Sequence, residues 1–253
     1  MSRIQGKTAF ITGASSGIGE AAARKFAEAG CNLVLAARRI ERLQALAAKL
    51  PAKCHLIELD VRDRQAVDSA VAAIPPEFAA IDILVNNAGK ARGLAKLHEA
   101  ELADQEEMID TNVKGLLYCT RAVVPGMIKH GYGHVINIGS IAGHETYPNG
   151  SVYCASKHAV DAITKGLRLD LVDTPVRVST VDPGLVETEF SLVRFHGDTE
   201  RAKKVYVGYQ PLTADDVAET ILWVADRPEH VQIAEVIILP SAQANAYVTH
   251  KTS

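Results

Sequence analysis

The chain of 253 residues is 47% hydrophobic and 23% charged, which is typical of a globular protein. Its formal net charge is −3, and no basic stripe with interleaved aromatic residues appears, so we expect no nucleic-acid partner. No apolar run approaches the ~20 residues that span a bilayer, and the first residues contain no signal-peptide core. We therefore expect a cytoplasmic protein with a small-molecule substrate and no membrane partner.

The four cysteines, at positions 31, 54, 119 and 154, are scattered without a C-x-x-C pair, and the nine histidines are equally dispersed. This distribution indicates reduced thiols and predicts neither a disulfide framework nor a metal site. No linker, repeat or low-complexity tract divides the sequence, so we expect one domain over residues 1–253.

Short apolar runs alternate with longer segments of helical period along the chain. The expected strands are residues 8–12, 33–37, 55–59, 83–86, 135–138, 176–181 and 236–239. The expected helices are residues 18–29, 40–50, 64–74, 103–130, 151–171 and 214–225. Continuously apolar strands are typical of sheets that are buried on both faces. The alternation therefore predicts an α/β fold, a doubly wound parallel sheet of about seven strands with helices on both faces.

Residues 184–210 interrupt this alternation with a long, mixed and charge-rich segment. Loops of that length in a compact domain are usually functional. Ligands of such sheets bind beyond the carboxyl ends of the strands. We therefore expect residues 184–210 to form a substrate lid at that edge.

A glycine motif follows the first strand, in Thr12-Gly13-Ala14-Ser15-Ser16-Gly17-Ile18-Gly19 with Ala22 three positions later. The pattern G-x-G-x-x-[G/A] between a strand and a helix is typical of dinucleotide binding. Glycine lets the backbone approach a pyrophosphate, and the helix N-terminus offers unpaired N–H groups with a partial positive charge. A tight turn is the alternative. The expected cofactor contacts are Gly13, Ser15, Ser16, Gly17, Ile18 and Gly19.

The end of the second strand distinguishes between the two nicotinamide dinucleotides. An NAD site usually has Asp or Glu about twenty residues past the glycines, where it binds the ribose 2′-hydroxyl. This chain has Ala37 there, followed by Arg38 and Arg39. Two guanidiniums bind a 2′-phosphate by charge-assisted contacts, so we expect NADP. The alternative is a solvated basic start to the next helix.

Two further strand ends carry polar residues. Asp60 and Val61 follow the third strand and are expected to contact the adenine, unless Asp60 only caps the turn. Asn86-Asn87-Ala88-Gly89 follows the fourth strand and is a turn by composition. Its amides either hold neighbouring strand ends or face the nicotinamide ribose, and Asn87, Ala88 and Gly89 are included among the cofactor candidates.

Tyr153 and Lys157 stand four residues apart in the expected helix 151–171, and therefore on one helix face. A nearby ammonium favours the phenolate and lowers a phenol pKa that is otherwise about 10. Such a phenol transfers protons near neutral pH. An exposed amphipathic face is the alternative. Ser140 follows the fifth strand, either as a turn residue or close enough for its hydroxyl to meet that of Tyr153.

These motifs together resemble the short-chain dehydrogenase/reductase family: Thr12-Gly13-x-x-x-Gly17-x-Gly19, Asn86-Asn87-Ala88-Gly89, Ser140, Tyr153-x-x-x-Lys157 and Pro183-Gly184. The match runs from residue 7 to about residue 240. The resemblance implies a Rossmann-type domain and reversible hydride transfer at a nicotinamide.

The resemblance also implies roles for individual residues. Tyr153 would be the general acid or base, and Lys157 would bind the nicotinamide ribose and depress the Tyr153 pKa. Ser140 would hydrogen-bond the substrate oxygen, and Asn112 would hold a water of the proton relay. The backbone of Val186 would meet the carboxamide, and Thr188 would contact it or a phosphate. For Pro183-Gly184 a tight turn is the alternative, and Thr188 could instead cap the following helix.

The segment Glu189–Asp198 and the end of the chain are similar to those of the NADP-dependent 3-hydroxy acid (serine 3-) dehydrogenases. That subgroup oxidises small β-hydroxy acids and reduces the matching semialdehydes. A carboxylate substrate needs a cation, for which Arg194 is the first candidate; the alternative is a surface arginine paired with Glu189 or Asp198. His144 is a weaker candidate, and Tyr147 and Phe190 would line the pocket.

Two other functions remain open at this stage. One is an NADPH-dependent reductase of a larger carbonyl compound, such as a sugar, a 3-ketoacyl thioester or a xenobiotic ketone. The other is a non-catalytic NADP-sensing protein, which the presence of Ser140, Tyr153 and Lys157 disfavours. The family resemblance implies a homotetramer, or else a dimer. Residues 241–253 are expected to cross a neighbouring subunit or to be disordered.

Overall fold

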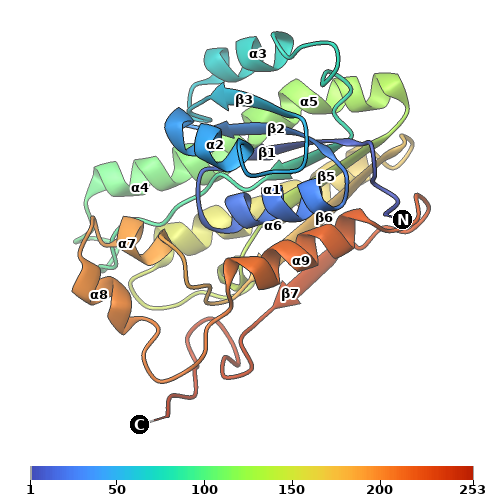
Figure 1. Ribbon diagram of the computed structural model, residues 1–253. Coiled ribbons are helices and arrows are strands. Elements are labelled where there is room, and N and C mark those ends of the chain that lie inside the picture. Colours follow the sequence, from blue (N-terminus) through green and yellow to red (C-terminus); the bar gives the residue numbers. More distant parts are fainter. Residues whose placement is uncertain (1, 253) are drawn as a thin grey trace.

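A single parallel sheet forms the centre of the molecule in the computed structural model, which describes residues 2–252 (Figure 1). Its strand order is β3-β2-β1-β4-β5-β6-β7, and every neighbouring pair is parallel. The strands are β1 Thr8–Thr12, β2 Asn32–Ala37, β3 Cys54–Glu58, β4 Ile83–Asn86, β5 Gly133–Ile138, β6 Val176–Pro183 and β7 Glu235–Ile238. The predicted seven-stranded α/β fold is confirmed, with strand ends shifted by at most two residues.

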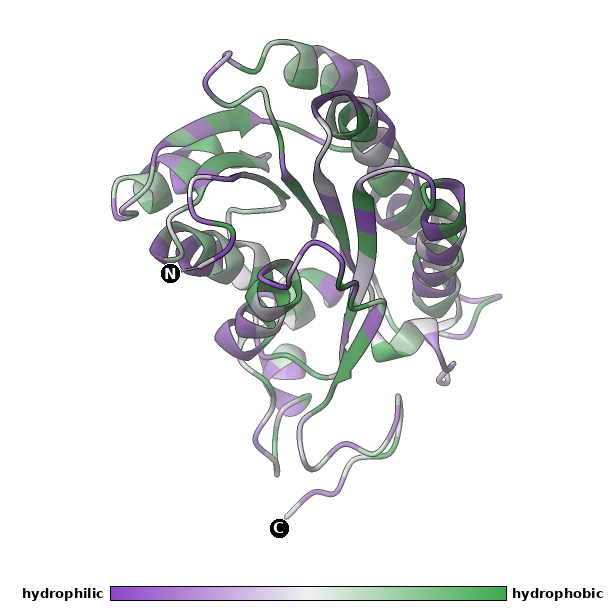
Figure 2. Cartoon of the chain, turned by 90° about the vertical axis from the view of Figure 1, so that its right-hand side faces the viewer, coloured by the Kyte–Doolittle hydropathy of each residue, from purple (hydrophilic) through white to green (hydrophobic). Residues whose placement is uncertain are grey.

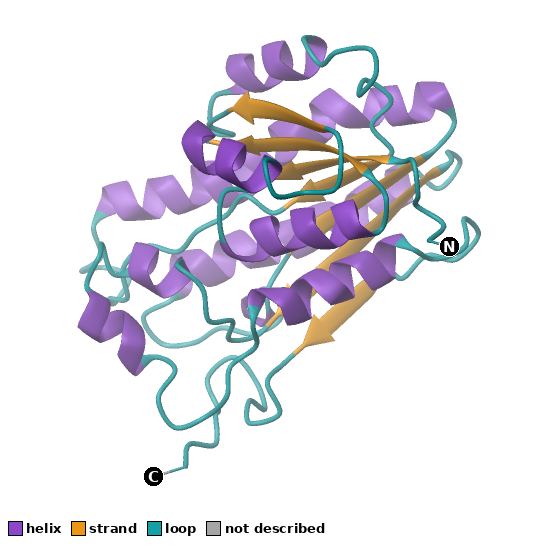
Figure 3. Ribbon diagram, viewed as in Figure 1, coloured by secondary structure: helices purple, strands orange, loops and turns teal. Residues whose placement is uncertain are grey.

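Helices cover both faces of this sheet, as Figure 3 shows. They are α1 Gly17–Glu28, α2 Ile40–Ala47, α3 Arg64–Ala72, α4 Leu102–Ile109, α5 Leu116–His130, α6 Ser151–Asp170, α7 Phe190–Arg194, α8 Thr199–Lys204 and α9 Ala214–Ala225. Among the residues described, no helix is long and apolar enough to cross a membrane.

Alternate residues of one strand supply two separate cores. Ile11 of β1 packs with Phe26 of α1 and Ile221 of α9, whereas its neighbour Phe10 packs on the opposite face with Met127 of α5. All five side chains are fully buried. In Figure 2 the central strands are largely hydrophobic, which explains why their sequences are continuous apolar runs.

The expected helix 103–130 is not one continuous α-helix. A π-helical turn, Asp110–Gly115, separates α4 from α5. Gly115 lies against Val61, and a Cβ there would approach the Val61 Cβ to 3.1 Å. π-helical turns are frequent at functional sites, and this one contains Asn112. The apolar spacing of the sequence predicted one continuous helix and did not reveal this turn.

Residues 184–210 contain the short helices α7 and α8, rather than an irregular loop. Asp198 caps α8 by accepting a hydrogen bond from the Arg201 amide at 2.9 Å. The two helices lie beyond the ends of the strand arrows in Figure 1.

Residues 239–252, which follow β7, contact other parts of their own chain. The expected crossing to a neighbouring subunit stays a prediction. The buried side-chain oxygen of Gln243 accepts a hydrogen bond from the Leu185 amide at 2.9 Å. Further along, the Thr252 amide donates to the carbonyl of Gly208 at 2.7 Å. The tail therefore supports both ends of the segment 184–210.

Candidate active site

A cavity of about 340 Å³ lies at the carboxyl ends of the strands. β1 stands between β2 and β4 in the sheet, so the chain reverses its direction of winding there, which is where ligands bind in doubly wound sheets. Most residues singled out from the sequence line this one cavity: Gly13, Ser15, Ser16, Gly17, Ile18, Arg38, Arg39, Asp60, Val61, Asn87, Ala88, Gly89, Ser140, Tyr153, Lys157, Pro183, Gly184, Val186, Thr188, Phe190 and Arg194. Gly19 and Asn112 do not line it. Tyr147, which was predicted to line the pocket, does not line this cavity either and reaches it only through Arg194.

The glycine loop owes its shape to close packing against Asn87. Gly13 has φ +67°, and a Cβ there would stand 2.9 Å from the Asn87 amide nitrogen. A Cβ at Gly19 would overlap the same amide. Asn87 in turn donates to the carbonyl oxygens of Thr12 and Gly13, at 2.9 and 3.2 Å. Gly19 therefore supports the loop from behind and does not face the cavity.

Asn86 and Asn87 hold the strand ends together, which was the first of the two roles considered for them. The side-chain nitrogen of Asn86 donates to Thr120 at 3.0 Å and to Asn137 at 2.9 Å. Both bonds are buried. The edge of the sheet that carries the cavity is therefore cross-linked by amides.

Arg39 contacts the glycine loop directly. Its Nε and NH2 lie 3.3 and 3.2 Å from the Ser15 hydroxyl, and NH2 lies 2.9 Å from that of Ser16. Arg38 is exposed and lines the cavity beside it. No carboxylate follows β2, so the positive charge at this point of the cavity favours an anion.

Asp60 is held by a residue that the sequence did not single out. Arg62 donates to both of its carboxylate oxygens, and their closest contact is 2.6 Å. This hydrogen bond is the main reason why the pKa of Asp60 is lowered. Asp60 therefore stays ionised and fixed at the rim, next to Val61.

Tyr153 and Lys157 both lie on α6, and both are buried. The Lys157 Nζ stands 6.0 Å from the centre of the Tyr153 ring and donates to the Ile138 carbonyl at 2.9 Å. Ser140 follows β5 and lines the same cavity as Tyr153, and its hydroxyl donates to the Pro183 carbonyl at 3.4 Å. The same hydroxyl accepts from the Ala142 amide at 3.1 Å. Three groups that can move a proton thus meet at one strand end, and the exposed-face alternative is wrong.

The expected effect of Lys157 on Tyr153 is not found. Burial is the largest influence on Tyr153 and raises its pKa, while the nearby guanidinium of Arg194 and the Ser140 hydroxyl lower it. Burial also lowers the pKa of Lys157 to about 8. Sequence spacing predicted the pair correctly, but not that both side chains would be buried, where desolvation outweighs the charge.

Comparison with known proteins places this constellation in a family. The model of the short chain dehydrogenases matches residues 7–197, more than half of the chain. The chain belongs to the short-chain dehydrogenase family.

Two similar relatives share nearly the whole chain. An NADP-dependent 3-hydroxy acid dehydrogenase of Schizosaccharomyces pombe is 46% identical over 97% of both chains. A protein of the same name from Salmonella typhi is 48% identical over 93% of this chain and 96% of its own. Among solved structures, the closed form of a serine dehydrogenase complexed with NADP+ matches with a TM-score of 0.93 and 45% identity, covering 97% of this chain and 100% of that one.

Asn112 is the dehydrogenase residue expected to hold a water for the proton relay, and it is buried as expected. Its side-chain oxygen accepts from the Lys90 amide at 2.8 Å. Its nitrogen donates to the Lys90 carbonyl at 2.8 Å and to the Ser156 hydroxyl at 2.9 Å. The side chain therefore ties the loop after β4 to α6. The role in a water relay stays a prediction.

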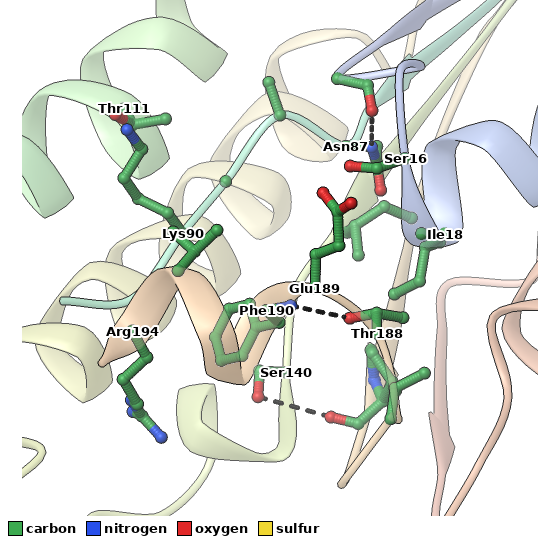
Figure 4. A pocket seen from close by; sticks show the side chains of 18 of the residues that line it. Ser16, Ile18, Asn87, Lys90, Thr111, Ser140, Thr188, Glu189, Phe190 and Arg194 are labelled. Atoms are coloured by element: carbon green, nitrogen blue, oxygen red, sulfur yellow. Dashed lines mark hydrogen bonds between the residues drawn. The ribbon is translucent and has the colours of Figure 1, made fainter. Parts of the chain in front are cut away.

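Arg194 ends α7, the short helix that begins at Phe190 (Figure 4). Its guanidinium carbon lies 5.2 Å from the centre of the Tyr153 ring and 5.6 Å from that of Phe190, and its NH2 donates to the Tyr147 hydroxyl. The predicted alternative, a surface pair with Glu189 or Asp198, is wrong. The buried Nε has no hydrogen-bond partner among the described residues. Buried donors are rarely left unpaired, so this one marks a place for an acceptor.

One charged cluster of the cavity wall was not predicted from the sequence. Lys90 lines the cavity, is almost fully buried and lies 2.6 Å from Glu107. Burial raises the pKa of Glu107, but hydrogen bonds from Lys90 and Arg92 outweigh it and lower the value to about 2. Arg92 also donates to the Val193 carbonyl at 2.8 Å, which connects this cluster to α7. The only signal in the sequence was the basic pair directly after Asn-Asn-Ala-Gly.

His144, the weaker substrate candidate, does not line the cavity. Its Nε2 lies 3.0 Å from Asp182, and its Nδ1 lies 3.5 Å from Glu235. Potential metal-ligand atoms of these three residues lie within 4.8 Å of one another. Asp182 also accepts from Thr180 at 2.6 Å. The group is thus a polar network behind Ser140, where His144 contacts Asp182 at the end of β6.

Proposed function

We propose that this dehydrogenase is an NADP-dependent oxidoreductase for a small 3-hydroxy acid, of the serine or 3-hydroxypropionate type, and for its semialdehyde. The observation that carries the proposal is the half-buried side chain of Arg194 beside Tyr153, whose buried Nε has no hydrogen-bond partner among the described residues. A carboxylate is the group that a guanidinium binds best in a low-dielectric pocket. The names and high identity of the relatives support the same substrate class.

The proposed residue roles follow the geometry of the cavity. The catalytic residues are Asn112, Ser140, Tyr153 and Lys157. The cofactor-binding residues are Gly13, Ser15, Ser16, Gly17, Ile18, Gly19, Arg38, Arg39, Asp60, Val61, Asn87, Ala88, Gly89, Tyr153, Lys157, Pro183, Gly184, Val186 and Thr188. The substrate residues are Ser140, Tyr147, Phe190 and Arg194, and residues 184–210 act as the lid. Gly19 and Asn112 act from behind the cavity wall.

The fit of NADP rests on the chemistry of the cavity wall. Arg38 and Arg39 flank the place where a 2′-phosphate would sit, and the Ser15 and Ser16 hydroxyls supply further polar contacts. When bound, the nicotinamide supplies or accepts the hydride. The start of α1 offers backbone N–H groups to the pyrophosphate.

The protein itself moves the proton. In the direction of reduction, Tyr153 donates its proton to the substrate carbonyl oxygen, while the Ser140 hydroxyl hydrogen-bonds the same oxygen as charge develops on it. Lys157, held by the Ile138 carbonyl, presents its ammonium to the ribose and to the phenolate that forms. Arg194 orients the substrate through its carboxylate, so that its reacting carbon faces the nicotinamide.

The substrate class is tested by comparing turnover of small acids with that of bulky ketones. NADPH oxidation is measured with malonic semialdehyde and with a panel of sugar, 3-ketoacyl and xenobiotic ketones, and NADP reduction with serine and 3-hydroxypropionate. The small acids are expected to be turned over at least tenfold more efficiently. No turnover of any small hydroxy acid would refute the proposed substrate class and favour a reductase of larger carbonyl compounds.

We also propose a homotetramer in the cytoplasm, with a dimer as its building block. Large apolar side chains are exposed on two surfaces: Leu117 and Ile128 on α5, and Trp223 and Ile237 on α9 and β7. Paired copies would bury these patches. Light scattering coupled to size exclusion distinguishes the states, and a monomer at micromolar concentration would refute the proposal.

A further inference from the structure

Glu189, the first residue before α7, bridges two arginines from a distant part of the chain. Its Oε2 lies 3.1 Å from the Arg39 NH1, and its Oε1 lies 2.8 Å from the Arg42 NH1. In Figure 4 its carboxylate extends from the lid toward the side of the cavity where Ser16 lies. One carboxylate therefore joins the lid to the start of α2, on the opposite rim of the cofactor cavity.

The orientation of the Arg39 guanidinium determines which of its edges can bind a phosphate. Its Nε and NH2 form the side edge of the guanidinium, and both face the Ser15 hydroxyl, at 3.3 and 3.2 Å. This edge is the one that binds phosphate with two parallel hydrogen bonds. Glu189 contacts the remaining nitrogen, NH1. The carboxylate thus holds the guanidinium from behind and leaves the phosphate-binding edge directed at the serines.

Arg42 completes the arrangement. It also pairs with the carboxylate, so that two guanidiniums, those of Arg39 and Arg42, share one negative charge and the cluster stays net positive toward a phosphate. The hydrogen bond from Arg42 is also the largest cause of a lowered Glu189 pKa, which keeps this carboxylate ionised at neutral pH. Arg42 itself does not line the cavity, so its effect on a ligand acts through Glu189.

We propose that Glu189 is a positioning residue for NADP specificity: it fixes Arg39 for the 2′-phosphate and fastens the lid to that end of the cofactor. This inference rests on the proposed use of NADP. Without Glu189 the Arg39 side chain samples several rotamers. The entropy lost when Arg39 becomes ordered then weakens the binding of the cofactor. A cofactor without a 2′-phosphate does not bind this edge of Arg39, so its dissociation constant does not depend on Glu189.

Glu189→Gln tests the proposal, because it keeps the shape of the side chain and removes its charge. Dissociation constants are measured for NADPH and NADH, and for the fragments 2′,5′-ADP and 5′-AMP, which do not reach the catalytic end. The values for NADPH and 2′,5′-ADP are expected to rise about two- to fivefold, the effect of one partly exposed charge pair. Those for NADH and 5′-AMP are expected to stay unchanged.

Glu200→Gln is the matched control, since it removes the same charge from the lid. Within residues 2–252, Glu200 pairs only with Lys203, at 3.3 Å. It is expected to leave all four constants unchanged. Arg42→Ala is expected to weaken NADPH by less than Glu189→Gln and to add nothing in the double variant. Thermal melts check that every variant is folded.

The outcomes separate the possibilities. Tighter NADPH binding in Glu189→Gln would mean that the carboxylate competes with the 2′-phosphate. Unchanged binding, or equally weakened binding of NADPH and NADH, would mean that Glu189 does not position Arg39. Each of these results overturns the inference. A wild-type protein that does not prefer NADPH to NADH would instead refute the proposed NADP dependence itself.

Discussion

Replacing Arg194 with methionine removes the guanidinium while keeping an unbranched side chain. In the wild-type cavity the guanidinium lies 5.2 Å from the centre of the Tyr153 ring, and its Nε is free to donate. A hydrogen bond to a charged group contributes about 1.5–3 kcal/mol, so two such bonds to a substrate carboxylate contribute about 3 kcal/mol or more. We expect kcat/KM for malonic semialdehyde to fall at least about a hundredfold.

The assay needs a control because Arg194 has a second effect, as its charge lowers the pKa of the buried Tyr153. NADPH oxidation is therefore followed with malonic semialdehyde and with propanal, which has the same carbon chain but no carboxylate. Loss of carboxylate binding reduces only the first rate, whereas a less acidic Tyr153 reduces both. A further variant, Tyr147→Phe, removes the other hydrogen-bond partner of Arg194 and tests its orientation.

Equal losses with the two aldehydes would refute the reasoning, since they would mean that Arg194 serves the Tyr153 phenol and not the substrate. Wild-type activity with both would mean that the guanidinium is merely a packing group.

Three more predictions follow from the same site. Tyr153→Phe is expected to lower kcat at least a thousandfold while the NADPH dissociation constant, measured by fluorescence, stays within about twofold; appreciable turnover would contradict its role as the acid. Arg38→Ala combined with Arg39→Ala is expected to raise the dissociation constant of NADP far more than that of NAD, and equal effects would remove the argument for a 2′-phosphate site. Burial lowers the pKa of Lys157 from 10.5 to about 8, so the unfolded state holds more protons between pH 8 and 10.5, and this residue contributes stability that increases with pH in that window. Lys157→Met is therefore expected to raise the free energy of unfolding at pH 7 by up to roughly 3 kcal/mol, and this gain is expected to shrink toward pH 10. The free energy is measured by denaturant titration at several pH values. A gain that does not depend on pH would show that desolvation of the ammonium is not its cause.

Local patterns were enough for the fold, because the signals that specify a doubly wound sheet are short in range. Continuous apolar runs, such as 33–37 and 83–86, became central strands since both faces of the sheet are covered. The spacing of Tyr153 and Lys157 placed both on one face of α6, and the glycines after β1 were in the expected turn. Regular spacing could not reveal the π-helical turn at Asp110–Gly115, which depends on how α5 packs against the loop at Val61.

The sequence by itself determined the sheet, the family and the chemistry of hydride and proton transfer, since these depend on motifs within a few residues of one another. Only the tertiary structure decided how the charges are used. Glu189 meets Arg39 and Arg42 across about 150 residues of chain, and Arg194 meets Tyr147 across 47. Burial then reversed the expected change in the Tyr153 pKa. Distant pairing and desolvation both follow from packing in three dimensions, and neither leaves a periodic mark in the sequence.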